Sequence, residues 1–107
     1  MLIFVENDNH FKSLLDTYKS NKIVIFFTDL SNPECQQITH LIEEFARKYE
    51  NEAKMFEVDI NRCQETDATY SFYSLPTFMV LHDGKVVEQT SGIDEDCLTY
   101  FFQNNFE

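Results

Sequence analysis

The sequence contains little of what marks a disordered or low-complexity chain. It has only two glycines and two prolines among 107 residues, whereas hydrophobic residues make up 43% and aromatic residues 15%. Disordered segments are poor in aromatic and aliphatic residues, so this composition excludes that class. A chain of this length can bury roughly 60 to 70% of its unfolded surface. We therefore expect a single domain over residues 1–107.

Basic side chains are also scarce. Eight Lys and Arg oppose 19 Asp and Glu, which gives a formal net charge of −11. Because the negative charge is spread along the chain, the surface should repel phosphate backbones and acidic lipid headgroups. We therefore expect no nucleic acid and no membrane among the direct partners.

Cysteines are few, odd in number and widely spaced, at Cys35, Cys63 and Cys97. This arrangement matches neither a disulfide framework nor a Cys-x-x-Cys zinc site, so we expect no metal and no cofactor. The apolar run over residues 1–5 has no basic start and is too short for a signal peptide or a membrane span. These features predict a cytoplasmic protein, with a nuclear location as the alternative.

Hydrophobic patterning in the first half of the chain predicts alternating strands and helices. Residues 2–5 form a short apolar run, and apolar residues then recur at helical spacing up to residue 18. Residues 22–28 are continuously apolar and β-branched, which is typical of a central strand buried on both faces. After a polar turn, residues 33–49 carry one apolar stripe and predict a single long amphipathic helix.

The second half continues the alternation and adds a hairpin. Residues 53–60 predict a strand, and residues 64–72 predict a helix with Ala68 and Phe72 facing inward. Two β-rich runs flank an Asp-Gly turn signal and predict a β-hairpin over residues 77–90.

The C-terminal segment completes the pattern with a helix that begins near residues 93–96. Its inward residues are predicted to be Leu98, Phe101 and Phe102. The resulting order is β-α-β-α-β-α-β-β-α. This order predicts an α/β fold, with a mixed central β-sheet flanked by about four helices.

Several short motifs stand at fixed places in this order. They are Phe26-Phe27 before the turn, Glu57-Val58-Asp59 at a strand end, Leu75-Pro76-Thr77-Phe78, Asp83-Gly84-Lys85 and Ser91-Gly92. Their order and spacing resemble the thioredoxin family over essentially the whole chain. The resemblance implies the thioredoxin fold.

The resemblance fails at the active-site turn. The family has Trp-Cys-Gly-Pro-Cys after the central strand, and gap-free matching places there Leu30, Ser31, Asn32, Pro33 and Glu34. The family's buried Asp falls on Ile25, and its helix-kinking proline falls on Thr39. Disulfide reduction needs a thiolate and a second, resolving thiol. We therefore expect a redox-inactive turn without classical protein-disulfide reductase activity.

The side chains that occupy the turn suggest no replacement chemistry. The Ser31 hydroxyl has no evident base in the sequence, and none of the three histidines has the context of a hydrolase. Glu34 stands in the first turn of a helix, where the dipole favours a carboxylate. Catalytic residues are therefore not expected at Ser31 or Glu34.

Cys35 directly follows the turn, and three roles stay open for it. Its thiol could be a small buried hydrophobic group, a monothiol or regulatory thiol, or one half of an interchain disulfide. Helix-dipole acidification and repulsion by Glu34 oppose each other there. We expect a monomer, with a Cys35-linked dimer as the alternative.

The substrate-recognition half of the resemblance is retained. Leu75-Pro76 resembles the family's cis-proline site, where an extended peptide pairs with the backbone. The peptide-binding groove that this implies is formed by Leu30, Pro33, Tyr73, Ser74, Leu75, Pro76 and Gly92. The alternative is that the proline only shapes the fold and that Tyr73 is an exposed loop aromatic.

Three functions follow from these features. The first is a redox-inactive thioredoxin-like module that binds or regulates a protein or extended peptide partner through the groove. The second is an atypical thioredoxin-like oxidoreductase that uses Cys35 as a monothiol in cell redox homeostasis. The third is an assembly subunit similar to the small spliceosomal thioredoxin-like proteins, which is less compatible with the Leu75-Pro76-Thr77-Phe78 motif.

Overall fold

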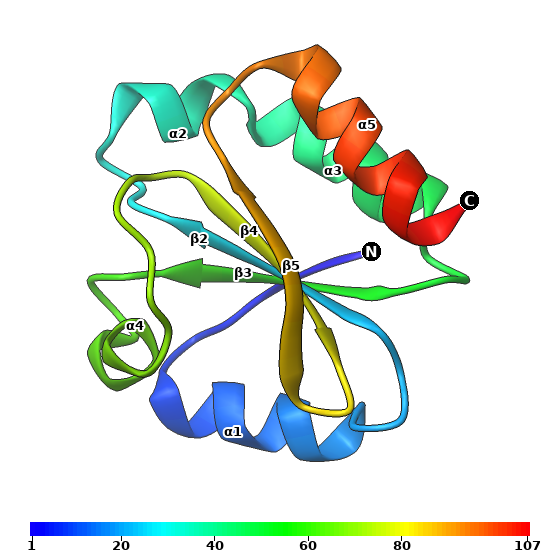
Figure 1. Cartoon of the computed structure of the whole chain (residues 1–107). Coiled ribbons are helices and arrows are strands. Elements are labelled where there is room, and N and C mark those ends of the chain that lie inside the picture. Colours follow the sequence, from blue (N-terminus) through cyan, green and yellow to red (C-terminus); the bar gives the residue numbers. More distant parts are fainter.

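A five-stranded mixed sheet forms the centre of the computed structural model, which describes all of residues 1–107 (Figure 1). The strands are β1 (Leu2–Phe4), β2 (Ile23–Thr28), β3 (Lys54–Asp59), β4 (Thr77–His82) and β5 (Lys85–Ser91). Their order across the sheet is β1-β3-β2-β4-β5. β1 and β2 pair parallel with β3, whereas β4 pairs antiparallel with β2 and β5. The predicted mixed sheet and its C-terminal hairpin are confirmed.

Helices cover both faces of the sheet. They are α1 (Asp8–Thr17), α2 (Pro33–Gln37), α3 (Thr39–Lys48), α4 (Gln64–Thr69) and α5 (Glu95–Phe106). α3 and α5 pack on one face, and α1 and α4 lie on the other (Figure 1). None of these helices is both long and apolar enough to span a bilayer.

The prediction of one long helix over residues 33–49 is wrong, because that segment forms two helices. α2 ends at Gln37 and α3 begins at Thr39, with Ile38 between them at φ −100° and ψ 3°. The Thr39 hydroxyl donates to the Cys35 carbonyl oxygen at 3.4 Å. A hydroxyl that bonds the carbonyl four residues back bends a helix. The chain therefore has five helices, although Thr39 replaces the proline that kinks the family's helix.

Two apolar cores fill the space between the sheet and its helices. All six residues of β2 are buried, and alternate side chains point to opposite faces. Phe26 stacks on Phe78 of β4 in the core under α3 and α5, with ring centroids 5.0 Å apart. Ile25 and Phe27 point into the other core, which α1 and the α4 segment cover. β2 thus has the two buried faces that its continuous apolar run predicted.

α4 is shorter than predicted, and a different side of the helix faces inward. The helix ends at Thr69, Ala68 is exposed, and Thr66 is the residue that faces inward. The Thr66 hydroxyl and amide both donate to one Asp8 oxygen, at 2.7 and 2.9 Å. This link between two helices turns the polar side of α4 toward α1. Phe72 is partly buried against Phe27 but lies beyond the helix.

Candidate functional site

The turn after β2 is held by a carboxylate. The Asp29 Oδ1 atom accepts hydrogen bonds from the Ser31 amide at 3.0 Å and from the Ser31 hydroxyl at 2.7 Å. The Asn61 side-chain amide donates to the same oxygen at 3.1 Å from the loop after β3. The Ser31 hydroxyl, followed by its amide, lowers the pKa of Asp29 below its usual value. This carboxylate is therefore a weaker base than an ordinary aspartate.

These contacts correct one part of the sequence analysis, which found no base near Ser31. Asp29 does accept the Ser31 proton in a hydrogen bond, but no histidine or second carboxylate completes a nucleophilic triad around this hydroxyl. The Asp-x-Ser spacing is a known turn signal, so Asp29 could have been found from the sequence. Asn61 could not, because it lies 32 residues away.

The four residues that follow Ser31 have different environments at the start of α2. Asn32 caps the helix by accepting the amides of Glu34 at 2.8 Å and Cys35 at 3.2 Å. Pro33 and Glu34 are exposed, whereas Cys35 is only 2% exposed. The side chain at the family's second cysteine position is thus a carboxylate in water, and the neighbouring thiol points inward.

The Gln36 side chain closes the turn. Its Nε2 donates to the Leu30 carbonyl oxygen at 2.8 Å, so the residues before and after the helix start are tied together. Leu30 itself remains 45% exposed. Hydrogen bonds accepted by Asp29 and Asn32 and donated by Gln36 therefore fix a turn that carries no thiol on its outer surface.

The two other cysteines lie outside the turn, on other segments of the chain. Cys63 is buried in the α1/α4 core, and burial raises the pKa of its thiol. Cys97 is exposed in the first turn of α5, where the Asp94 carboxylate raises the pKa of its thiol. No three His, Cys, Asp or Glu side chains are grouped so that they could hold a metal ion.

The segment before β4 approaches the same end of the sheet. The Leu75–Pro76 peptide bond is cis, and the Pro76 carbonyl oxygen accepts the Gly92 amide at 3.0 Å. Thr77, the first residue of β4, pairs with Phe27 of β2 and with Ser91 of β5. This register brings Leu30, Pro76 and Gly92 to one end of the sheet, although they come from three segments.

A hydroxyl pair fixes the start of β4. The Thr77 hydroxyl donates to the Ser74 carbonyl oxygen at 2.6 Å, so the Ser91 hydroxyl must be the donor in the 2.7 Å contact between Thr77 and Ser91. Neither Thr77 nor Ser91 was singled out from the sequence as a site residue. Their contacts hold the backbone of residues 74–76 next to the end of β5.

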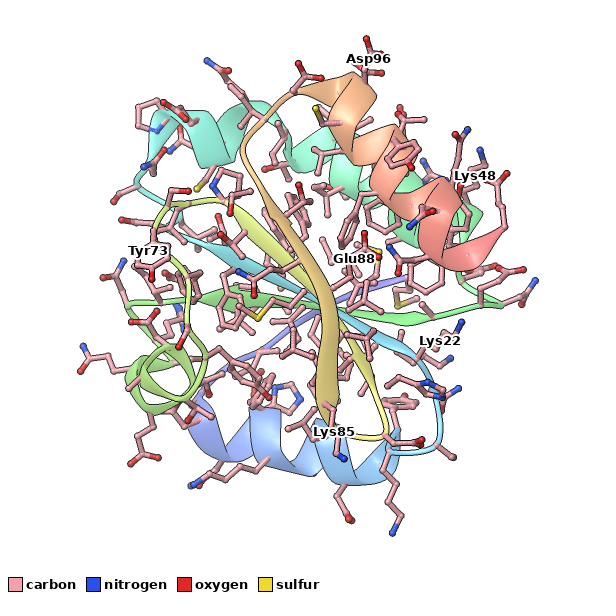
Figure 2. All side chains as sticks on the ribbon, in the orientation of Figure 1. Lys22, Lys48, Tyr73, Lys85, Glu88 and Asp96 are labelled. Atoms are coloured by element: carbon pink, nitrogen blue, oxygen red, sulfur yellow. The ribbon has the colours of Figure 1, made fainter.

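Backbone groups beside Pro76 are left without partners in the chain. The amides of Tyr73, Ser74 and Leu75 and the carbonyl oxygen of Leu75 form no hydrogen bond with any protein group. Tyr73 projects fully into solvent at the side of the molecule where α2 lies (Figure 2). Unpaired backbone groups beside an exposed aromatic ring are suited to pairing with an extended chain.

The seven predicted groove residues form an open face rather than a closed groove. None of the four surface cavities is lined by any of them. Pro76 is buried and Leu75 and Gly92 are partly buried, whereas the other members are exposed. We call this surface the cis-proline face, defined by Leu30, Pro33, Tyr73, Ser74, Leu75, Pro76 and Gly92.

Comparison with known proteins places the chain in a family. The family model for thioredoxin matches residues 2–104. Thioredoxin H4 of Arabidopsis thaliana is 32% identical over 81 residues, which is 75% of this chain and 68% of that protein. Thioredoxin of Staphylococcus epidermidis is 30% identical over 92 residues, which is 86% of each chain.

Solved structures agree with the sequence relatives. Reduced thioredoxin pre-protein of Schistosoma mansoni superposes with a TM-score of 0.87 at 26% identity and covers 98% of both chains. A thioredoxin of Nicotiana alata gives a TM-score of 0.89 at 21% identity, covering 99% of this chain and 93% of that one. The fold is therefore the thioredoxin fold, and the chain belongs to the thioredoxin family.

Proposed function

We propose that this chain is a redox-inactive thioredoxin-like protein that binds or regulates a protein partner through the cis-proline face. One observation carries the proposal. The active-site turn presents a hydroxyl and a carboxylate instead of two thiols, while the neighbouring backbone amide and carbonyl of Leu75 have no partner in the chain. Without a thiolate there is no sulfur nucleophile, but a partner strand can still pair with the backbone.

The alternative, an atypical oxidoreductase that uses Cys35, is less compatible with the burial of this residue. Attack on a substrate disulfide requires a sulfur that the substrate can reach. The Cys35 side chain is 2% exposed, and its amide is tied to the Asn32 cap. A monothiol mechanism would therefore need α2 to open before each turnover. The same burial opposes a Cys35-linked dimer.

A pull-down from native lysate tests the proposal. Wild-type protein is compared with Ser74→Trp, because an indole at this exposed position blocks the approach of an extended chain to the Leu75 backbone. We expect proteins retained by the wild type to be lost with Ser74→Trp. The matched control is Ser20→Trp, which places the same bulk on an exposed serine between α1 and β2. Equal retention by all three proteins would contradict the use of this face.

A further inference from the structure

Charge is divided unequally between the two ends of the sheet. The segments at the end that carries the cis-proline face are residues 5–10, 29–40, 59–76 and 92–96, and they contain ten acidic side chains and a single basic one, Arg62. The segments at the opposite end are residues 16–22, 47–54, 82–85 and 103–107. They contain five acidic and six basic side chains. The net charge of the protein is therefore concentrated at the end of the sheet that carries the cis-proline face.

The labelled lysines lie away from Tyr73 in the structure (Figure 2). Tyr73 projects from the side of the molecule where α2 lies, whereas Lys22, Lys48 and Lys85 lie on other sides, away from it. Lys22 precedes β2 and Lys85 begins β5, so both stand at the strand ends remote from the turn.

The acidic side chains near the face are not neutralised by the protein itself. Among the ten acidic side chains counted, only Glu65 has a cationic partner, Lys12 from within α1, at 3.5 Å. Arg62 places its guanidinium over the Phe4 ring, 5.5 Å from the centroid, and forms no ion pair. Glu34 and Asp96 are exposed and have no side-chain hydrogen bond. Like charges that remain unpaired on one surface attract a cationic ligand.

We infer that the segment bound at the cis-proline face is an extended peptide carrying Arg or Lys at alternate positions, an inference that rests on the proposed function. The unpaired amide and carbonyl of Leu75 provide for backbone pairing, and pairing places every second side chain on the same side of the bound strand. The fully exposed Tyr73 ring can stack on a guanidinium, which the net negative charge of this end of the molecule also attracts.

Fluorescence anisotropy with three short labelled peptides tests this inference. The peptides share one sequence of strand-forming residues and differ only at alternate positions, which carry Arg, Gln or Glu. We expect the Arg peptide to bind about ten-fold more tightly than the Gln peptide at low salt, and the Glu peptide to bind more weakly still. The advantage of Arg over Gln should shrink on adding salt, because exposed charges are screened.

Two double variants test which end of the protein attracts the Arg peptide. Glu34→Gln with Asp96→Asn removes two exposed carboxylates at the end of the sheet that carries the face, and we expect it to weaken Arg-peptide binding about three- to ten-fold while leaving the Gln peptide unchanged. Asp16→Asn with Glu52→Gln makes the same change in net charge at the opposite end and should have a much smaller effect.

The outcomes separate the two claims. Equal affinity for the Arg and Gln peptides, with both lost in Ser74→Trp, would overturn the cationic partner and leave the proposed function standing. Equal weakening by the two charge variants would also overturn it, since it would show attraction to total charge only. Arg-peptide binding that survives Ser74→Trp, or failure of all three peptides to bind, would contradict the proposed function as well.

Discussion

Ser31 shows how one side chain changes the chemistry at the start of a helix. A cysteine there can ionise and be stabilised by the helix dipole, but a serine hydroxyl stays protonated near neutral pH. Its proton is directed at Asp29, and the pKa of that carboxyl is lowered by the contact. A base with a lowered pKa is poorly suited to remove a proton. The hydroxyl is thus a structural donor that fixes the turn.

The thiols should differ in reactivity according to their burial. In native protein at neutral pH, we expect iodoacetamide to label Cys97 and to spare Cys35 and Cys63, which are buried. Mass spectrometry of labelled peptides, with urea-unfolded protein as the control, measures this. Asp94→Asn should accelerate labelling of Cys97, because the carboxylate that raises the pKa of this thiol is removed. Labelling of native Cys35 at the rate of Cys97 would support the monothiol enzyme.

Tyr73 separates binding from stability. Its side chain is fully exposed, so Tyr73→Ala should change the free energy of unfolding by less than about 0.5 kcal/mol. The same change should cost a bound partner roughly 1 to 3 kcal/mol, as exposed aromatic anchors commonly do. Denaturant unfolding and peptide titration measure the two quantities. A loss of stability without loss of binding would remove Tyr73 from the site.

The elements of this fold differ in how far the sequence could predict them. β2 is recognisable because all six of its residues are apolar or β-branched, and α5 because Leu98, Phe101 and Phe102 follow the i, i+3, i+4 spacing of a helix. The break between α2 and α3 is not recognisable, because the apolar stripe runs through it and only the Thr39 hydroxyl bond marks it. The orientation of α4 depends on Asp8, which is 58 residues away from Thr66 in sequence.

The break between α2 and α3 leads to a prediction about proline. Thr39 is the first residue of α3, a position where proline is well tolerated, so Thr39→Pro should keep the free energy of unfolding within about 1 kcal/mol of wild type. Glu44→Pro changes an exposed residue inside the same helix and should cost about 3 kcal/mol or more. Urea unfolding followed by circular dichroism measures the free energy of unfolding of both variants. A similar decrease in the two variants would show that the segment needs a continuous helix.

Asp8, the first residue of α1, caps the start of α4. It accepts the Thr66 hydroxyl and amide and the Glu65 amide at the start of α4, and the Thr66 bonds lower the pKa of the Asp8 carboxyl. A lowered pKa in the folded state means that this stabilisation is present above the ordinary value of 3.8 and is lost as pH falls through the folded value.

Asp8→Asn should therefore lower the melting temperature at neutral pH, and the difference from wild type should narrow as the pH falls below 3.8. Thermal unfolding followed by circular dichroism over a pH series measures both effects. Asp16→Asn, an exposed change at the other end of α1, is the control. A difference that stays constant with pH would show that the charge of Asp8 does not contribute.

The molecule as a whole has the fold of a thioredoxin, but its residues differ from the family pattern around the end of β2. The mixed sheet and the helices that cover it have the arrangement of a thioredoxin, as the TM-score of 0.87 to the Schistosoma mansoni structure shows. The differences gather where β2 ends: Ile25 fills the position of the family's buried Asp within an apolar core, and Ser31 and Glu34 occupy the thiol positions. Restoring the thiols alone should therefore leave the resolving cysteine without a proton acceptor.

The reduction of insulin disulfides with dithiothreitol as electron donor tests the proposed absence of redox activity most directly. We expect the wild-type protein to give the rate of the reaction without added protein, because neither Ser31 nor Glu34 can exchange with sulfur. Ser31→Cys with Glu34→Cys should recover part of the rate of an authentic thioredoxin, which shows that the fold is competent in the assay. Wild-type turnover near that of an authentic thioredoxin would contradict the account.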